Sequence, residues 1–231
     1  LTKAFHLRSS FLLIFLCLLS ELYLFVDPIA IDIFVNQAGW GQDKYNVIIG
    51  GLVVLSIMIG QISGGMLGRR FGVRKVSMIG FTCLAAANAM LAVLQPYWTN
   101  TAIMVSYLVI RGLINGVAWI CVVAVAMKMT WSKVGGTQFT AYMSMFNLSG
   151  VMAYTFTGKM LEIFDNDYSK AIYAGAALTL ITVVFLTFID PDECNRVLET
   201  GDEGEGAMDA DLGESSWWTD EEGGGDSVAT A

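Results

Sequence analysis

The chain has 231 residues, of which 55% are hydrophobic and 15% are charged, and its mean hydropathy is +0.59. Soluble domains carry about 25% charged residues, so the composition excludes an ordinary soluble protein. The net charge of −8 is unevenly distributed. From Asp190 onward there are fourteen acidic residues and one base, whereas the preceding part holds seven acids and twelve bases. An acidic segment therefore follows a mildly basic body, and we expect no nucleic-acid partner.

Apolar residues form six blocks, each long enough to cross a membrane as a helix. The blocks hold about 19 to 26 residues, and a helix rises 1.5 Å per residue against a hydrocarbon core of ~30 Å. Lipid offers the backbone no hydrogen-bond partner, so such segments are expected to be helical. The sequence predicts an all-α integral membrane protein, with a six-helix bundle at 1–189 and a disordered acidic tail at 190–231. The blocks cover residues 10–35, 46–67, 76–94, 102–127, 138–161 and 171–189.

The first block contains Pro28 and three acidic residues, Glu21, Asp27 and Asp32. A charge at mid-bilayer costs ~2.5–3.5 kcal/mol, so each acid is a functional candidate. Helical geometry places Glu21, Pro28 and Asp32 close to one face, and Pro28 is expected to kink the helix. Asp27 points roughly 120° away, on the side of Tyr23, whose hydroxyl could reach it. We predict proton coupling at Glu21, Asp27 or Asp32, with Glu21 first, because protonation removes the cost of burying an unpaired carboxylate.

A basic loop, GGMLGRRFGVRK at residues 64–75, separates the second and third blocks. Short loops rich in Lys and Arg stay on the cytoplasmic side of a membrane. With the N-terminus inside, nine bases fall on the cytoplasmic side and three on the other side. Both termini are therefore expected in the cytoplasm. Within the second block, Gly60, Gly64 and Gly68 are spaced to let a neighbouring helix approach closely.

The fourth block carries Arg111 near its middle, with Asn115 one turn later and Tyr107 one turn earlier. A guanidinium that faces a cavity can bind a carboxylate or phosphate in bidentate fashion, which makes Arg111 and Asn115 candidate substrate ligands. The alternative is an internal ion pair of Arg111 with Glu21 or Asp32. The two can coexist if the pair opens when substrate or a proton arrives.

The fifth block is unusually polar, and four of its polar residues share one helical face. Such a face suits a wet cavity, where Ser144 and Asn147 are candidate substrate ligands. The alternative is hydrogen bonding between helices, worth ~0.6–2 kcal/mol per contact. Two lone amides elsewhere, Gln61 and Asn88, are expected to serve packing. The four residues of this face are Thr140, Ser144, Asn147 and Tyr154.

The sequence offers no pattern typical of catalysis or metal binding. HExxH, GxSxG and spaced metal-ligand sets are all missing, and the four cysteines lie far apart. We therefore expect no enzymatic activity, no metal and no cofactor. The expected partners are a small-molecule solute, protons and the lipid bilayer.

The basic loop resembles the major facilitator superfamily pattern G-G-x-L-x-D-R-x-G-x-R-K. Arg69 occupies the acidic position of that pattern, where the family's acid pairs with neighbouring helix charges to latch one conformation. The resemblance implies that the loop takes part in gating, with a latch that differs from the family's or uses another partner. The matching residues are Gly64, Gly65, Leu67, Arg70, Gly72, Arg74 and Lys75.

A narrower resemblance joins residues 22–51 and 127–150 to the AmpG-type muropeptide permeases and their relatives. Asp27 falls where that family carries an acid, and Asn147 lies in its matching eleventh helix. This implies that the chain supplies helices seven to twelve of a twelve-helix carrier in an inner or plasma membrane. In that superfamily cargo binds at the midplane between two rocking halves. The N-terminal half would come from the same polypeptide, which the Leu1 start favours, or from a second chain.

These observations favour a secondary active transporter that imports an anionic or amphiphilic solute, such as a muropeptide, by proton symport and alternating access. Two alternatives stay open. The same fold could export a sugar or a drug by antiport. A non-transporting membrane scaffold or sensor could instead act through the acidic tail.

Overall fold

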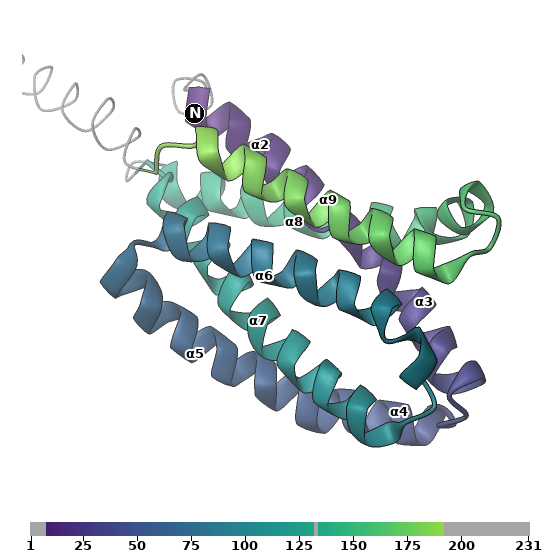
Figure 1. The fold of residues 1–231 in the computed structure, drawn as a ribbon. Coiled ribbons are helices and arrows are strands. Elements are labelled where there is room, and N and C mark those ends of the chain that lie inside the picture. Colours follow the sequence, from purple (N-terminus) through teal and green to yellow (C-terminus); the bar gives the residue numbers. More distant parts are fainter. Residues whose placement is uncertain (1–7, 132–133, 192–231) are drawn as a thin grey trace, which may run out of the picture.

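The computed structural model describes residues 8–131 and 134–191, and throughout this part the chain forms helices and no strands (Figure 1). The first span combines α2 (Arg8–Ser20), the 3₁₀ turn η1 (Leu22–Phe25), α3 (Val26–Asp32) and the π-helical turn η2 (Ile33–Gln37). The second combines α4 (Gln42–Ile48), the π-helical turn η3 (Ile49–Val53) and α5 (Val54–Phe71). The remainder comprises α6 (Val73–Val93), η4 (Gln95–Tyr97), α7 (Thr101–Lys128), α8 (Gly135–Ile163) and α9 (Tyr168–Phe188).

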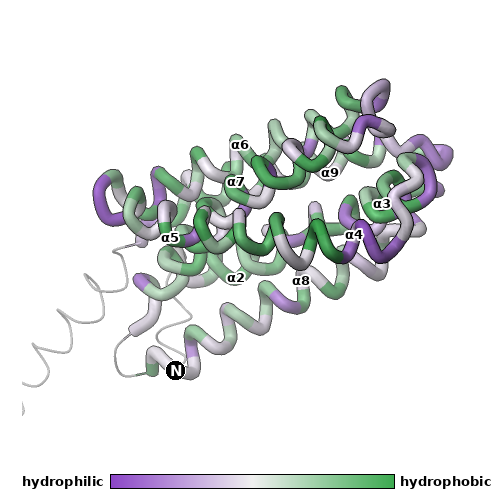
Figure 2. Tube along the Cα trace, turned by 90° about the horizontal axis from the view of Figure 1, so that it is seen from below, coloured by the Kyte–Doolittle hydropathy of each residue, from purple (hydrophilic) through white to green (hydrophobic). Residues whose placement is uncertain are grey.

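The six long helical segments confirm the predicted six-helix architecture. Five are long and apolar enough to cross a membrane by composition alone: Ser10–Gln37, Gln42–Phe71, Val73–Val93, Thr101–Lys128 and Tyr168–Phe188. The sixth, α8, has 29 residues, but its hydroxyl and amide side chains lower its hydropathy. Figure 2 shows apolar residues along the helices, with hydrophilic residues gathered towards their ends. The tail predicted from residue 190 onward lies almost wholly outside the described residues.

The basic loop and the end of the last helix lie at the same end of the bundle (Figure 1). Gly72 ends α5 with φ +91°, a conformation that favours glycine, and α6 begins at the next residue. Arg74 Nε then donates to the carbonyl of Leu186 at 2.9 Å, and Arg74 Nη2 donates to the carbonyl of Thr187. Arg74 thereby satisfies carbonyls in the last turn of α9. The start of α2 lies at this same end, in agreement with an even number of crossings.

The N-terminal end of α9 lies at the opposite end of the bundle and is capped by Asp167. The Asp167 carboxylate accepts a hydrogen bond from the backbone N–H of Lys170 at 3.2 Å. This bond lowers the pKa of Asp167 below its ordinary value, because it stabilises the ionised form. The stabilisation is present at neutral pH, and it is lost as the pH falls through this lowered pKa.

The first span is irregular one turn before Pro28, where Glu21 and η1 interrupt the α-helix. The proline ring excludes the usual bond to the carbonyl of residue 24, so the helix breaks there as expected. Two hydroxyls of α8 bond to the irregular stretch. Ser149 Oγ accepts from the Glu21 backbone N–H at 3.2 Å, and Thr157 Oγ1 donates to the Phe25 carbonyl at 3.3 Å. These bonds replace intrahelical partners that lipid could not supply.

Replacing Thr157 by Val is expected to destabilise the bundle by about 0.6–1.7 kcal/mol, because the Phe25 carbonyl then loses a partner inside the membrane. Thermal unfolding of the purified protein in detergent measures the change. Thr155→Val is the matched control, since in the part of the chain that the structure describes the exposed Thr155 hydroxyl bonds only to the Val151 carbonyl of its own helix. Equal losses in the two variants would contradict a bridging role for Thr157.

Glycines bring α5 and α7 into backbone contact, as the small-residue spacing predicts. A Cβ on Gly60 would overlap the carbonyl oxygen of Leu113, and one on Gly64 would lie 2.9 Å from the Cα of Val117. From the other side, a Cβ on Gly116 would overlap the carbonyl oxygen of Ile57. Only glycine fits at these positions, so they determine how closely the second and fourth spans pack.

Candidate functional site

An ion pair between the first and fourth spans lies at the centre of the candidate site. Arg111 Nη2 on α7 donates to Asp27 Oδ1 on α3 at 2.9 Å, and the two side chains are 21% and 30% exposed. Asp27 follows the irregular stretch of the first span, which positions its carboxylate opposite α7. Each charge compensates the other, and the pair can therefore exist inside the hydrocarbon region.

Two polar residues on neighbouring helices extend this ion pair. Arg111 Nε donates to Asn88 Oδ1 on α6 at 2.8 Å, and Asn88 Nδ2 donates to Thr179 Oγ1 on α9 at 3.4 Å. Asn88 is buried with 1% exposure. Asn88 therefore links helices within the bundle, and its contact with Arg111 was not predicted. A single amide within an apolar helix was the available signal, but the partner of Asn88 lies 23 residues away in the sequence.

A second hydrogen bond links the same two spans one turn from the ion pair. Tyr23, which is buried, donates its hydroxyl to Asn115 Oδ1 at 3.1 Å. The predicted bond between Tyr23 and Asp27 is therefore wrong. The 3₁₀ turn between them changes the angle that a regular helix would give, so the two side chains separate.

The structure does not pair Arg111 with either acid that the sequence suggested. Asp32 accepts hydrogen bonds from Asn36 at 2.5 Å and from the Tyr168 hydroxyl at 2.6 Å, at the start of α9. The Glu21 carboxylate bonds to none of the residues that the structure describes, although its backbone N–H bonds to Ser149. The alternative of an ion pair between Arg111 and Glu21 or Asp32 is thus wrong, because the helix break turns Asp27 towards α7.

The polar residues of α8 stay apart from this network. Ser144 and Asn147 are exposed, and among the described residues Ser144 bonds only to the Thr140 carbonyl of its own helix. Tyr154 and Thr140 are exposed on the same helix, so the predicted shared face exists. Within the described ranges, no hydrogen bond joins Ser144 or Asn147 to Arg111 or Asn115. Two other hydroxyls of α8, on Ser149 and Thr157, do bond to the first span.

The residues assigned to a gating loop have different surroundings. Gly64 packs against α7, whereas a Cβ on Gly65 would meet open space. Arg70 and Lys75 are exposed, and Arg74 is bound to the end of α9. The loop therefore joins the ends of α5, α6 and α9, and its gating role stays a prediction.

A bundle of membrane-length helices with an internal ion pair between its first and fourth spans defines a multi-pass membrane protein. Residues 3–214 match the family model of the Major Facilitator Superfamily. The chain belongs to this superfamily of transporters. No curated protein and no solved structure matches it. Membership points to transport rather than to enzymatic activity, and it leaves the AmpG-type resemblance without further support.

Proposed function

We propose that the chain is one half of a proton-coupled secondary transporter that imports an anionic or amphiphilic solute, such as a muropeptide, by alternating access. The observation that carries the proposal is the intramembrane pair of Asp27 and Arg111. An ion pair at this depth is costly and marks a path for substrate or ions. An anionic group on a solute can replace Asp27 at the guanidinium, because carboxylates and phosphates bind there in the same way.

The proton acceptor in this proposal is Glu21. Its side chain lies at the helix break and has no partner among the residues of the described ranges, so a proton can reach or leave it without first opening an ion pair. Asp27 accepts a proton only when Arg111 turns to the solute. Protonation of Glu21 and release of Asp27 from Arg111 would then occur within the same irregular span, which is the coupling that symport requires.

The exposed polar face of α8 supports a two-half architecture. Ser144, Asn147 and Tyr154 would be poorly placed against lipid, and they suit the wall of a wet cavity. In this proposal, a second six-helix half, from the same polypeptide or a second chain, supplies the opposite wall. Within this half, the solute then contacts Asn147 and Ser144 on α8 and Arg111 and Asn115 on α7. The end that carries the basic loop faces the cytoplasm of an inner or plasma membrane.

Solute uptake into proteoliposomes with an imposed pH gradient tests the proposal. The full-length parent protein is assayed with a panel of muropeptides, sugars and acyl-CoA-like anions. Glu21→Gln is expected to abolish gradient-driven uptake, because the amide cannot carry a proton. Glu162→Gln on the exposed surface of α8 is the matched control and is expected to leave uptake unchanged.

Different results would redirect the proposal. Uptake that persists in Glu21→Gln would contradict Glu21 as the acceptor. Efflux driven by the opposite gradient would favour the antiport alternative over symport. Folded protein that moves no member of the panel in either direction would overturn transport of these solutes.

A further inference from the structure

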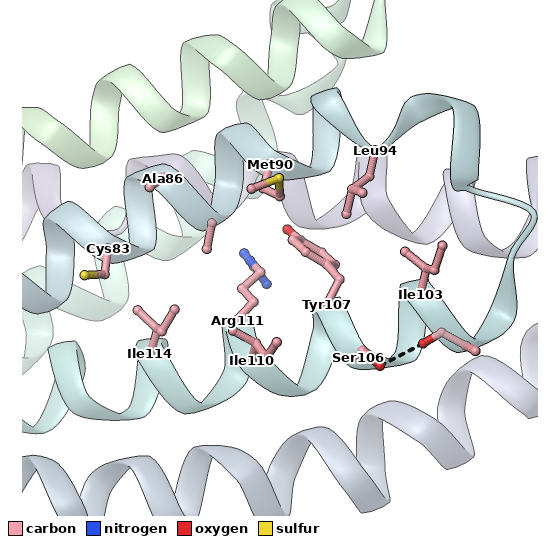
Figure 3. A pocket seen from close by; sticks show the side chains of 12 residues that line it. Cys83, Ala86, Met90, Leu94, Ile103, Ser106, Tyr107, Ile110, Arg111 and Ile114 are labelled. Atoms are coloured by element: carbon pink, nitrogen blue, oxygen red, sulfur yellow. Dashed lines mark hydrogen bonds between the residues drawn. The ribbon is translucent and has the colours of Figure 1, made fainter.

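A cavity of about 690 Å³ lies between α6 and α7, and it shares Arg111 with the proposed transport path. Its lining is mostly aliphatic, with Met90 on α6, Leu94 directly after α6, and Ile103 and Ile110 on α7 (Figure 3). Ile110 is 59% exposed and Cys83 is also exposed, and both lie well inside their helices, so the cavity opens through the side of the bundle. The volume lies within the range of about 300–1,000 Å³ that is typical of small-molecule sites.

Two polar groups reach into this apolar cavity from one face of α7. Tyr107 and Arg111 are one helical turn apart, and Figure 3 shows both side chains extending from α7 towards α6. Tyr107 is only 8% exposed, and its hydroxyl has no hydrogen-bond partner within the described part of the chain. A buried hydroxyl without a partner is costly, and native structures seldom leave one so.

The guanidinium also has donors to spare. Arg111 uses Nε for Asn88 and Nη2 for Asp27, and in the described ranges Nη1 has no partner. A group that accepts from both Arg111 Nη1 and the Tyr107 hydroxyl would satisfy both residues at once. A carboxylate or a phosphate ester has this geometry and charge.

We propose that this cavity, named here the α6–α7 pocket, binds an anionic amphiphile that enters from the bilayer. Its apolar chain lies along Met90, Leu94 and Ile103, and its head group accepts hydrogen bonds from Tyr107 and Arg111. The ligand chemistry is a hydrocarbon chain with one anionic head, as in a fatty acid or an acidic phospholipid. Binding here needs no proton gradient and no second half, so this inference goes beyond the proposed function.

Photolabelling in lipid nanodiscs tests the proposal. The full chain in phosphatidylcholine nanodiscs is irradiated with a dodecanoate that carries a diazirine near its chain end, and labelled peptides are mapped by mass spectrometry. We expect labels on α6 and α7 next to the α6–α7 pocket, with competition by unmodified dodecanoate. Dodecanol, which has the same chain without a charge, is expected to compete at least about tenfold less well, as for the loss of a charged hydrogen bond.

The decisive variant is Tyr107→Phe, which removes the hydroxyl and breaks no hydrogen bond to any described residue. It is expected to raise the half-maximal competing concentration of dodecanoate about tenfold while the unfolding temperature stays unchanged. Tyr154→Phe on the exposed face of α8 is the control and is expected to change neither quantity.

Adding an acidic phospholipid to the nanodisc distinguishes the two possible sources of the ligand, a phospholipid and a free fatty acid. If phosphatidylglycerol in the nanodisc suppresses labelling, the ligand is a phospholipid head group, and if it does not, the ligand is a single-chain acid. Labels placed away from α6 and α7, equal competition by the acid and the alcohol, or an unchanged Tyr107→Phe would each overturn the proposal. None of these results would affect the gradient experiment with Glu21→Gln, so the two proposals fail separately.

Discussion

Asp27→Asn is expected to destabilise the bundle by about 3 kcal/mol and to abolish gradient-driven uptake. The asparagine keeps the shape of the side chain but removes the charge that lies 2.9 Å from Arg111, leaving a guanidinium uncompensated between helices. Removing one partner of a buried pair costs about 3–5 kcal/mol, and we expect the lower end because Asp27 is partly exposed. Thermal unfolding in detergent measures the first effect and proteoliposome uptake the second.

The double variant Asp27→Asn/Arg111→Gln separates structure from transport. With both charges removed, most of the lost stability is expected to return, because no unpaired charge remains. Uptake is expected to stay abolished, since the anion-binding group is missing. Asp43→Asn, on the exposed first turn of α4, serves as the control for removing one acid. An Asp27→Asn protein that unfolds at the parent's temperature would contradict the role of the pair in stability.

Gly60→Val is expected to cost about 3 kcal/mol, at the upper end of overpacking effects. Its first side-chain atom would overlap the backbone carbonyl of Leu113, which cannot move aside as a flexible side chain could. The second and fourth spans must separate, and this also shifts Arg111 on α7 relative to Asp27. A lower unfolding temperature and a reduced yield of folded protein measure the effect.

Gly65→Val is the matched control for this substitution. It makes the same chemical change on the same helix, but a Cβ at Gly65 meets open space. We expect its unfolding temperature to stay close to the parent's. Similar losses in both variants would mean that the valines act through local helix propensity rather than through the contact between α5 and α7.

The local sequence pattern was sufficient to predict the membrane helices and their close glycine contact, because both depend on composition and residue spacing. Block length and hydropathy predicted six membrane helices, and the spacing of Gly60, Gly64 and Gly68 predicted a close helix contact. The shared exposed face of α8 also followed from spacing, because a regular helix fixes the angle between its residues. Each of these features repeats along one regular element.

The candidate site was only partly predictable, because it depends on a helix that is not regular. Arg111 and Asp27 were both identified as candidates. Treating the first span as one regular helix, however, suggested Glu21 or Asp32 as the partner of Arg111 instead of Asp27. The 3₁₀ turn before Pro28 changed that register. The hydrogen bond between Asn88 and Arg111 was not predicted, because Arg111 lies on another helix.

The sequence by itself determined that this protein lies in a membrane, that its described part holds six membrane-length helical segments, and which charged residues are placed within them, because lipid admits few alternatives for apolar segments and for buried charge. Only the tertiary structure decided which charges meet. The partners of Arg111 come from α3 and α6, and the hydroxyls that bond to the broken first span come from α8. These choices depend on how helices rotate and approach one another, which is set by packing between segments distant in the chain.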